Sequence, residues 1–123
     1  MELAWPEEIP PLALPVISDL YIIPNRQQPS CFVGATFERN FSNLHPESSV
    51  AEAYLRPRAA ALVPALKEAK LLSCKAGIRA MTQTHLPIVT QLNAKTWVLT
   101  GLGSKGLLYH AYLACQLAKR MSV

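Results

Sequence analysis

The stretch that most constrains the fold is TWVLTGLGSKGLLYH, residues 96–110. Its first five residues combine aromatic and β-branched side chains, which is typical of a β-strand. Glycines then follow in the pattern G-x-G-x-x-G, and apolar residues recur at helical spacing from Ser104 to Met121. The sequence therefore predicts a strand, a glycine-rich loop and a helix in this order.

The glycine-rich loop is a candidate ligand site. Glycine lets the backbone turn tightly and approach a ligand closely, and the following helix presents free N–H groups to an anion. Lys105 adds a cation at the same end of the helix. A Rossmann dinucleotide site is not expected, because that site needs an acidic residue further along and none follows Glu68. A glycine-rich turn that only lets the helix pack remains the alternative.

Charge is unevenly distributed along the chain. All eight acidic residues lie at or before Glu68, and the formal net charge of the whole chain is +4. Residues 1–68 carry a net charge of −3, and residues 69–123 carry +7. A segment without carboxylates suits an anionic partner such as a substrate carboxylate, a cofactor pyrophosphate or nucleic acid phosphate. A solvated basic face is the alternative.

The remaining patterns predict an α+β fold in a single domain, residues 1–123, with an antiparallel sheet and flanking helices. The proline-rich first fifteen residues are expected to form an extended loop. Ser49 and Glu52 form a capping-box pattern, which predicts a helix from about residue 49 that is kinked or restarted near Pro57 and kinked or ended at Pro64. Besides residues 96–100, alternation and β-propensity predict strands at residues 16–23, 31–37, 70–82 and 86–89. The apolar face of the last helix is expected at Leu108, Ala111, Tyr112, Cys115 and Ala118.

Arg79 lies between apolar residues in the predicted strand 70–82. An arginine in that setting suits a planar carboxylate, although an exposed or ion-paired residue on the polar face of the strand is the alternative. The three histidines show no metal-ligand spacing, so no metal site is expected. His85 precedes Leu86 and Pro87 in a predicted loop, where it could be catalytic, although a surface histidine is the commoner outcome in such a loop. The three cysteines, widely spaced and odd in number, favour a reducing compartment and are expected to be buried. No stretch predicts a membrane span or a signal peptide, so we expect a cytoplasmic protein.

The order of these motifs resembles a known family. Residues 76–89, AGIRAMTQTHLPIV, followed by the strand, loop and helix, are similar to the C-terminal signature of the D-amino-acid oxidase family of FAD-dependent oxidoreductases. Upstream, three further stretches resemble parts of that family: LPVISDLYIIP, CFVGATFE and AAALVPALKEA. Within the family, the motif most resembles the oxidoreductase part of a bifunctional enzyme that modifies the tRNA wobble uridine.

The resemblance implies a function and site residues. Arg79 would bind the carboxylate of an amine or amino-acid substrate, and the cofactor FAD would accept hydride from it. The flavin would be contacted by the loop and helix start, which comprise Gly101, Leu102, Gly103, Ser104, Lys105, Gly106 and Leu107. No dedicated catalytic acid or base is implied, because the cofactor supplies the difficult step. The subfamily resemblance adds tRNA as a partner, which the basic C-terminal half would suit.

The sequence also departs from the family pattern. Ser104 stands where a glycine is common, Gln83, Thr84 and His85 occupy a loop that often carries an acid, and the N-terminal FAD-binding half has no counterpart here. We therefore expect an incomplete portion of a flavoprotein fold that is inactive alone and either pairs with an FAD-binding half or self-associates. The alternative is a non-catalytic module that binds RNA or a partner chain through its basic half.

Overall fold

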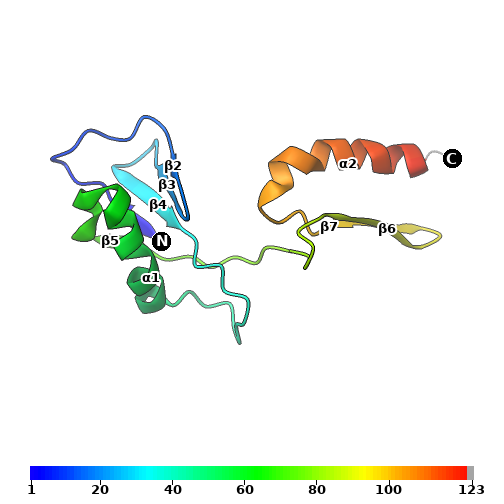
Figure 1. Cartoon of the computed structure of the whole chain (residues 1–123), viewed down its shortest axis with the longest axis horizontal. Helices are drawn as coiled ribbons and strands as arrows, with labels where there is room; N and C mark the ends of the chain where they lie inside the picture. The colour runs from blue at the N-terminus through cyan, green and yellow to red at the C-terminus, as the bar shows by residue number, and fades with distance from the viewer. Residues whose placement is uncertain (122–123) are drawn as a thin grey trace. The chain divides into compact units, whose positions relative to one another are not determined.

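A computed structural model describes residues 1–121 and divides the chain into two compact units, Met1–Gly77 and Ile78–Val123. Each unit combines antiparallel strands with a helix of at least fifteen residues, which confirms the predicted α+β class (Figure 1). The sequence predicted one domain. That both units serve one substrate- and flavin-contacting domain stays a prediction, and each unit is described separately below.

The first unit is built on a five-stranded antiparallel sheet in the order β2-β3-β4-β1-β5. Its strands are β1 (Glu2–Ala4), β2 (Val16–Ile17), β3 (Tyr21–Pro24), β4 (Ser30–Gly34) and β5 (Leu71–Ser73). The expectation of a loop over the first fifteen residues was wrong, because β1 pairs with β4 on one side and β5 on the other. The prolines that suggested a loop begin only at Pro6, so residues 1–4 keep every N–H that a central strand needs.

The predicted pair of strands around residues 16–37 is confirmed as the hairpin β3–β4, in which Ile22 pairs with Val33. Residues 16–23 do not form one continuous strand, however. The Ser18 N–H donates to the Leu20 carbonyl at 2.7 Å, and this tight turn separates β2 from β3. The segment therefore folds back on itself, with Val16 opposite Ile22.

Helix α1 (Ser48–Leu62) packs on this sheet through Ala51, Leu55 and Ala59, which are spaced four residues apart and buried. It passes through Pro57 and ends at Leu62, directly before a 3₁₀ turn, η1 (Pro64–Lys67). The predicted capping box is wrong, because Glu47 is the N-cap residue and makes no side-chain cap. The core shared by sheet and helix comprises Leu3, Trp5, Leu20, Ile22, Cys31, Val33, Ala51, Leu55, Ala59 and Leu66. Burial raises the pKa of the Cys31 thiol to about 11, so this cysteine is an inert core residue as predicted.

Arg56 ties the end of η1 to helix α1. Its guanidinium donates to the carbonyls of Leu66 and Lys67 at 3.3 Å and of Ala69 at 2.6 Å. The same side chain pairs with Glu52, one helical turn earlier. Arg56 thus adds donors to backbone carbonyls at the point where the chain leaves η1 and links them to helix α1.

The side chain of Glu2, in β1, accepts hydrogen bonds from polar side chains on two other strands and a turn. Its carboxylate accepts hydrogen bonds from the Ser30 hydroxyl at 2.8 Å, the Ser73 hydroxyl at 3.0 Å and the Asn25 amide at 3.4 Å. These bonds, led by those from Ser30 and Ser73, lower the pKa of Glu2 below its ordinary 4.5. The ionised carboxylate therefore favours the register of β1 against β4 and β5.

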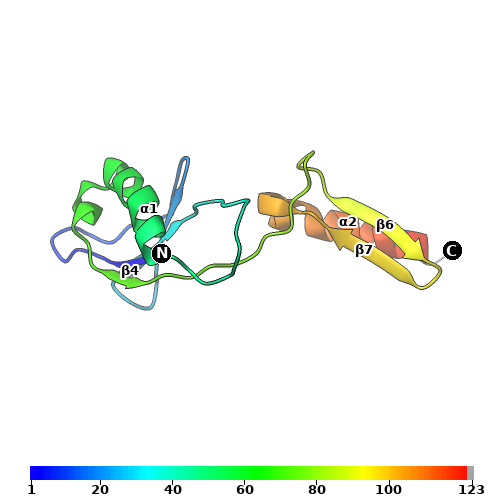
Figure 2. The same cartoon turned by 90° about the horizontal axis from the view of Figure 1, so that it is seen from below.

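The second unit consists of a hairpin, β6 (Ile88–Asn93) and β7 (Thr96–Thr100), a 3₁₀ turn, η2 (Gly103–Lys105), and helix α2 (Gly106–Met121). The predicted strand-loop-helix order is confirmed, and α2 runs alongside the hairpin (Figures 1 and 2). The predicted strand 70–82 is wrong beyond β5. Residues 74–80 have no strand partner in the described part of the chain, and only Met81 forms a single bridge, to Leu102.

The apolar face predicted for α2 is exposed. Leu108 and Tyr112 are 71% and 62% exposed, and Cys115 is exposed rather than buried as expected. The half-buried apolar positions of the helix are instead Tyr109, Leu113 and Leu117. Among residues 1–121, no helix has the length and apolarity needed to cross a membrane, and no group of three or more metal-ligating side chains occurs.

The Arg56 contacts predict a stability effect. Arg56→Ala removes three carbonyl contacts and the pair with Glu52, and a single hydrogen bond to a charged group contributes about 1.5–3 kcal/mol. We expect a loss of that size in the free energy of unfolding, measured by urea denaturation with far-ultraviolet circular dichroism. Arg39→Ala, in an exposed loop, is the matched control. Equal midpoints for the two variants would contradict the role of Arg56.

The Glu2 network predicts a pH dependence. Because the folded-state pKa is lowered, this carboxylate stabilises the fold above its unfolded-state pKa and loses that contribution as pH falls through the folded-state value. The difference in stability between the wild type and Glu2→Gln should therefore shrink as the pH falls below about 4.5. Denaturation midpoints across the acid range measure it, with Glu7→Gln as the control. A difference that is constant with pH would show that the carboxylate does not contribute through its charge.

Candidate functional site

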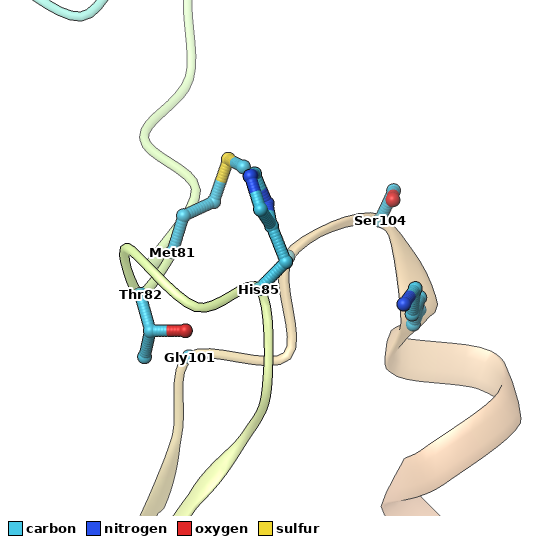
Figure 3. Close-up of a pocket in the computed structure, with 7 residues that line it drawn as sticks. Met81, Thr82, His85, Gly101 and Ser104 are labelled. Atoms are coloured by element: carbon cyan, nitrogen blue, oxygen red, sulfur yellow. The ribbon is translucent and has the colours of Figure 1, made fainter.

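The second unit holds a pocket of about 320 Å³ between two chain segments. One segment contributes residues from Met81 to His85, and the other contributes the glycine-rich loop from Gly101 to Lys105. Figure 3 shows Met81, Thr82 and His85 on the first segment and Gly101 and Ser104 on the second. The residues that line the pocket are Met81, Thr82, His85, Gly101, Gly103, Ser104 and Lys105.

Backbone contacts hold the two segments together. Met81 forms an antiparallel bridge with Leu102, and the Gly103 N–H donates to the Ala80 carbonyl at 3.1 Å. Each of these contacts joins residues about twenty positions apart in the sequence. They fix the glycine-rich loop against residues 80–82, and the pocket opens beside this junction.

The first segment turns sharply at its end. The Thr82 hydroxyl donates to the Leu86 carbonyl at 2.7 Å, and the His85 N–H donates to the Thr82 carbonyl at 3.2 Å. His85 has a φ of 56°, in the left-handed region that few side chains adopt. The turn therefore sets the direction in which the imidazole leaves the backbone.

The glycines of the loop have different structural roles. Gly101 has a φ of 70°, and a Cβ atom there would lie 2.7 Å from the Thr82 methyl carbon, so only glycine fits. Gly103 also has a positive φ, of 55°. Gly106, the first residue of α2, has open space where a Cβ would stand. Two of the three glycines thus serve the turn, and the third leaves the helix start accessible.

The structure places only some of the predicted cofactor-binding residues at the pocket. Gly101, Gly103, Ser104 and Lys105 line the pocket. The others do not: Leu102 forms the bridge to Met81, Gly106 begins α2, and Leu107 is 94% exposed. The glycine-rich loop is therefore brought to a pocket, while its assignment to a cofactor stays a prediction.

Arg79 does not lie in a strand, contrary to the sequence analysis. It is exposed, in the segment between β5 and Met81, and it is not among the residues that line the pocket. The alternation of apolar residues suggested a strand, but no neighbouring strand supplies hydrogen bonds to this segment in the described residues. Its assignment to a substrate carboxylate stays a prediction.

Met81 and Thr82 line the pocket although the sequence analysis did not include them among site residues. His85, for which the sequence left a catalytic and a surface role open, lines it as well. His85 was expected in a surface loop, and it is exposed in a loop. The segment Thr-x-x-His-Leu-Pro could have drawn attention to it, because it precedes a proline in a short turn. Its approach to the glycine-rich loop depends on long-range pairing, which no local pattern reveals.

The pocket lies in a positively charged environment. Lys105 lines it, and residues 78–123 contain no aspartate or glutamate. The Lys105 ammonium lies 6.0 Å from the centre of the Tyr109 ring, one turn along α2. The pocket also lies at the N-terminal end of α2, where helix N–H groups favour negative charge. A negatively charged or electron-rich ligand group suits this site.

Comparison with known proteins places the chain in context. The family model described as FAD dependent oxidoreductase matches residues 3–120. A protein of Maricaulis maris (strain MCS10), the tRNA 5-methylaminomethyl-2-thiouridine biosynthesis bifunctional protein, is 36% identical over 89 residues, which cover 72% of this chain and 15% of the relative. The protein of the same name from Idiomarina loihiensis is 29% identical over 107 residues, covering 83% of this chain and 18% of the relative. No solved structure matches the chain significantly.

The glycine geometry gives a matched pair of variants. Gly101→Ala forces a side chain into the left-handed region, at a cost of about 1–2 kcal/mol, and adds a clash with Thr82. Gly106→Ala meets no neighbour and should leave stability unchanged or slightly raised, since alanine favours helix. Amide chemical shifts of residues 80–86 and thermal denaturation measure both. Shifts of similar size in the two variants would rule out the proposed loop geometry.

Proposed function

Because the chain belongs to the family of FAD-dependent oxidoreductases, we propose that it supplies the substrate- and flavin-contacting C-terminal segment of an enzyme that oxidises an amine or amino acid. The observation that carries the proposal is the pocket in which the glycine-rich loop meets residues 81–85. A loop with two left-handed glycines, an open helix start and a lysine suits one end of a large anionic cofactor.

The residues present fit part of the cofactor. A pocket of about 320 Å³ is at the small end of ligand sites, large enough for a ring system and too small for a whole dinucleotide. The open space at Gly106 allows a ligand to approach the backbone of the helix start. The isoalloxazine end of FAD fits this description, and the remainder of the cofactor would be held by other parts of the enzyme.

In this proposal the bound flavin supplies hydride acceptance, and the chain supplies binding and electrostatics. The glycine-rich loop lets the flavin approach the backbone closely. The Lys105 ammonium and the N-terminal end of α2 would stabilise negative charge on a flavin bound in the pocket. Arg79 binds the substrate carboxylate, and no side chain is required as a catalytic acid or base.

The chain spans less than a fifth of the length of the curated relatives that it matches. We therefore propose an FAD-binding half as its principal partner, with self-association as the alternative. The uncovered face of α2 supports this proposal, since Leu107, Leu108 and Tyr112 are 94%, 71% and 62% exposed. Apolar surface of this kind on one helix usually packs against another part of a protein.

The relatives' names give the finer substrate class. Both contain the words tRNA and 5-methylaminomethyl-2-thiouridine biosynthesis, so we propose that the amine oxidised is a uridine side chain of tRNA. Residues 69–123 carry a net charge of +7 and contain no aspartate or glutamate, which suits an RNA partner. We place the enzyme in the cytoplasm with its tRNA. A non-catalytic module that binds RNA or a partner chain is the second candidate, favoured by the same charge.

A chimeric enzyme tests the proposal. The segment of the Maricaulis maris relative that aligns with this chain is replaced by the chain, and flavin absorbance and amine oxidation are measured. We expect bound FAD and activity. Arg79→Lys should lower kcat/KM roughly ten- to a hundredfold, because a charge-assisted two-pronged contact is lost, while flavin content stays unchanged.

Arg39→Lys, in the loop between β4 and α1, is the matched control. A colourless chimera that still binds tRNA would favour the non-catalytic module. If Arg79→Lys matched the control in kcat/KM, the carboxylate role of Arg79 would be wrong, even with flavin bound.

A further inference from the structure

Three basic side chains lie at the end of the second unit opposite the pocket. Lys95 lies in the turn between β6 and β7, and Lys119 and Arg120 lie in the last turn of α2. Both views show the hairpin turn, in yellow, and the end of α2, in red, at the same end of this unit (Figures 1 and 2). We call these three side chains the distal basic surface.

Local structure sets the positions of these cations. The Lys95 N–H donates to the Asn93 side-chain oxygen at 3.0 Å, which closes the hairpin turn. Lys119 and Arg120 belong to a helix that continues to Met121, and all three basic residues are exposed. Cations stabilise the C-terminal end of a helix. That effect accounts for Lys119 and Arg120, but it does not account for Lys95, which lies on the hairpin.

No carboxylate of the second unit neutralises the distal basic surface. Residues 78–123 contain no aspartate or glutamate. None of the three side chains forms an ion pair within residues 1–121, the part of the chain that the structure describes. Like charges at one end of a unit repel each other, so this surface favours a partner that carries several negative charges.

A ligand in the pocket is too far away to be that partner. The pocket lies at the start of α2, and a helix of 16 residues is about 24 Å long. Salt at physiological concentration screens charges beyond about 8 Å. The distal basic surface therefore needs an anion of its own, or a polyanion long enough to reach it from the pocket.

We propose that Lys95, Lys119 and Arg120 bind the phosphate backbone of RNA. Phosphates repeat about every 3.4 Å along one strand of a nucleic acid helix, so about seven nucleotides span the length of α2. Phosphate contacts position a nucleic acid without reading its sequence, which suits long, exposed side chains. An acidic protein would need a packed apolar interface core as well. The choice of RNA rests on the proposed function, whereas the location of the surface does not.

A salt-dependent titration tests the proposal. A fluorescein-labelled RNA hairpin is titrated with the full 123-residue chain, and fluorescence anisotropy follows binding at several salt concentrations. Each phosphate contact contributes about 0.7–0.9 to the slope of log affinity against log salt. We expect the triple variant Lys95→Gln, Lys119→Gln and Arg120→Gln to lower this slope by about two. Its affinity at about 0.1 M salt should fall roughly tenfold or more.

A charge-matched variant is the control. The substitutions Arg39→Gln, Lys67→Gln and Lys70→Gln remove the same number of charges from exposed positions of the first unit. This control should retain nearly the wild-type slope, although both triple variants have the same net charge. Glutamine keeps a helix propensity close to that of lysine and arginine, and far-ultraviolet circular dichroism shows whether α2 is intact. If the triple variant loses helix, Lys95→Gln alone is tested, and we expect it to lower the slope by about one.

Three outcomes overturn the proposal. They are the absence of measurable RNA binding by the wild type, equal slopes for the two triple variants, and displacement of the RNA by poly-L-glutamate at equal charge concentration. The last outcome would identify an acidic protein as the partner. The titration contains no flavin and measures no oxidation. Loss of RNA binding is therefore distinguishable from failure of the proposed function, which a colourless or inactive chimera reports.

Discussion

The hydrogen bond from the Gly103 N–H to the Ala80 carbonyl, with the bridge between Met81 and Leu102, is the constraint on which the candidate site depends. It joins a segment without regular secondary structure to the start of α2. The pocket lies beside this junction and is lined from both of the segments that it joins. The left-handed Gly101 makes it possible, because a side chain there would collide with Thr82.

Local patterns predicted local structure well. Strand β7, the glycine-rich loop and α2 follow from β-propensity, glycine spacing and apolar periodicity within residues 96–121. The hairpin β3–β4 was also predictable from two apolar runs and a turn-rich connection. The central position of β1 was not, because its partners are β4 and β5, which begin at Ser30 and Leu71. Pairing over such distances depends on tertiary packing, which a local pattern does not contain.

The contrast between local patterns and long-range pairing also explains which residues of the candidate site were predictable from the sequence. The glycine-rich loop was recognisable because its residues are consecutive, and its lysine and serine line the pocket. The loop sequence left open whether His85 is catalytic or a surface residue, because its place in the pocket depends on the long-range junction at Ala80 and Gly103. Arg79 is the opposite case. Its apolar neighbours predicted a strand, whereas residues 74–80 form none and Ile78 beside it is 68% exposed. An apolar sequence around a charged residue predicts burial only where another element covers it.

The exposed surfaces of the second unit have a common physical cause. The hairpin and one helix are too few elements to enclose a core, and α2 has no fully buried residue. The apolar residues expected to face a core are therefore left at the surface, as Leu108 and Tyr112 show. Their spacing is that of a packed helix, and the family match extends over both the first unit and the second. The periodicity of α2 is thus that of a helix whose apolar face is covered, and in the proposed enzyme the proposed FAD-binding half would supply that cover.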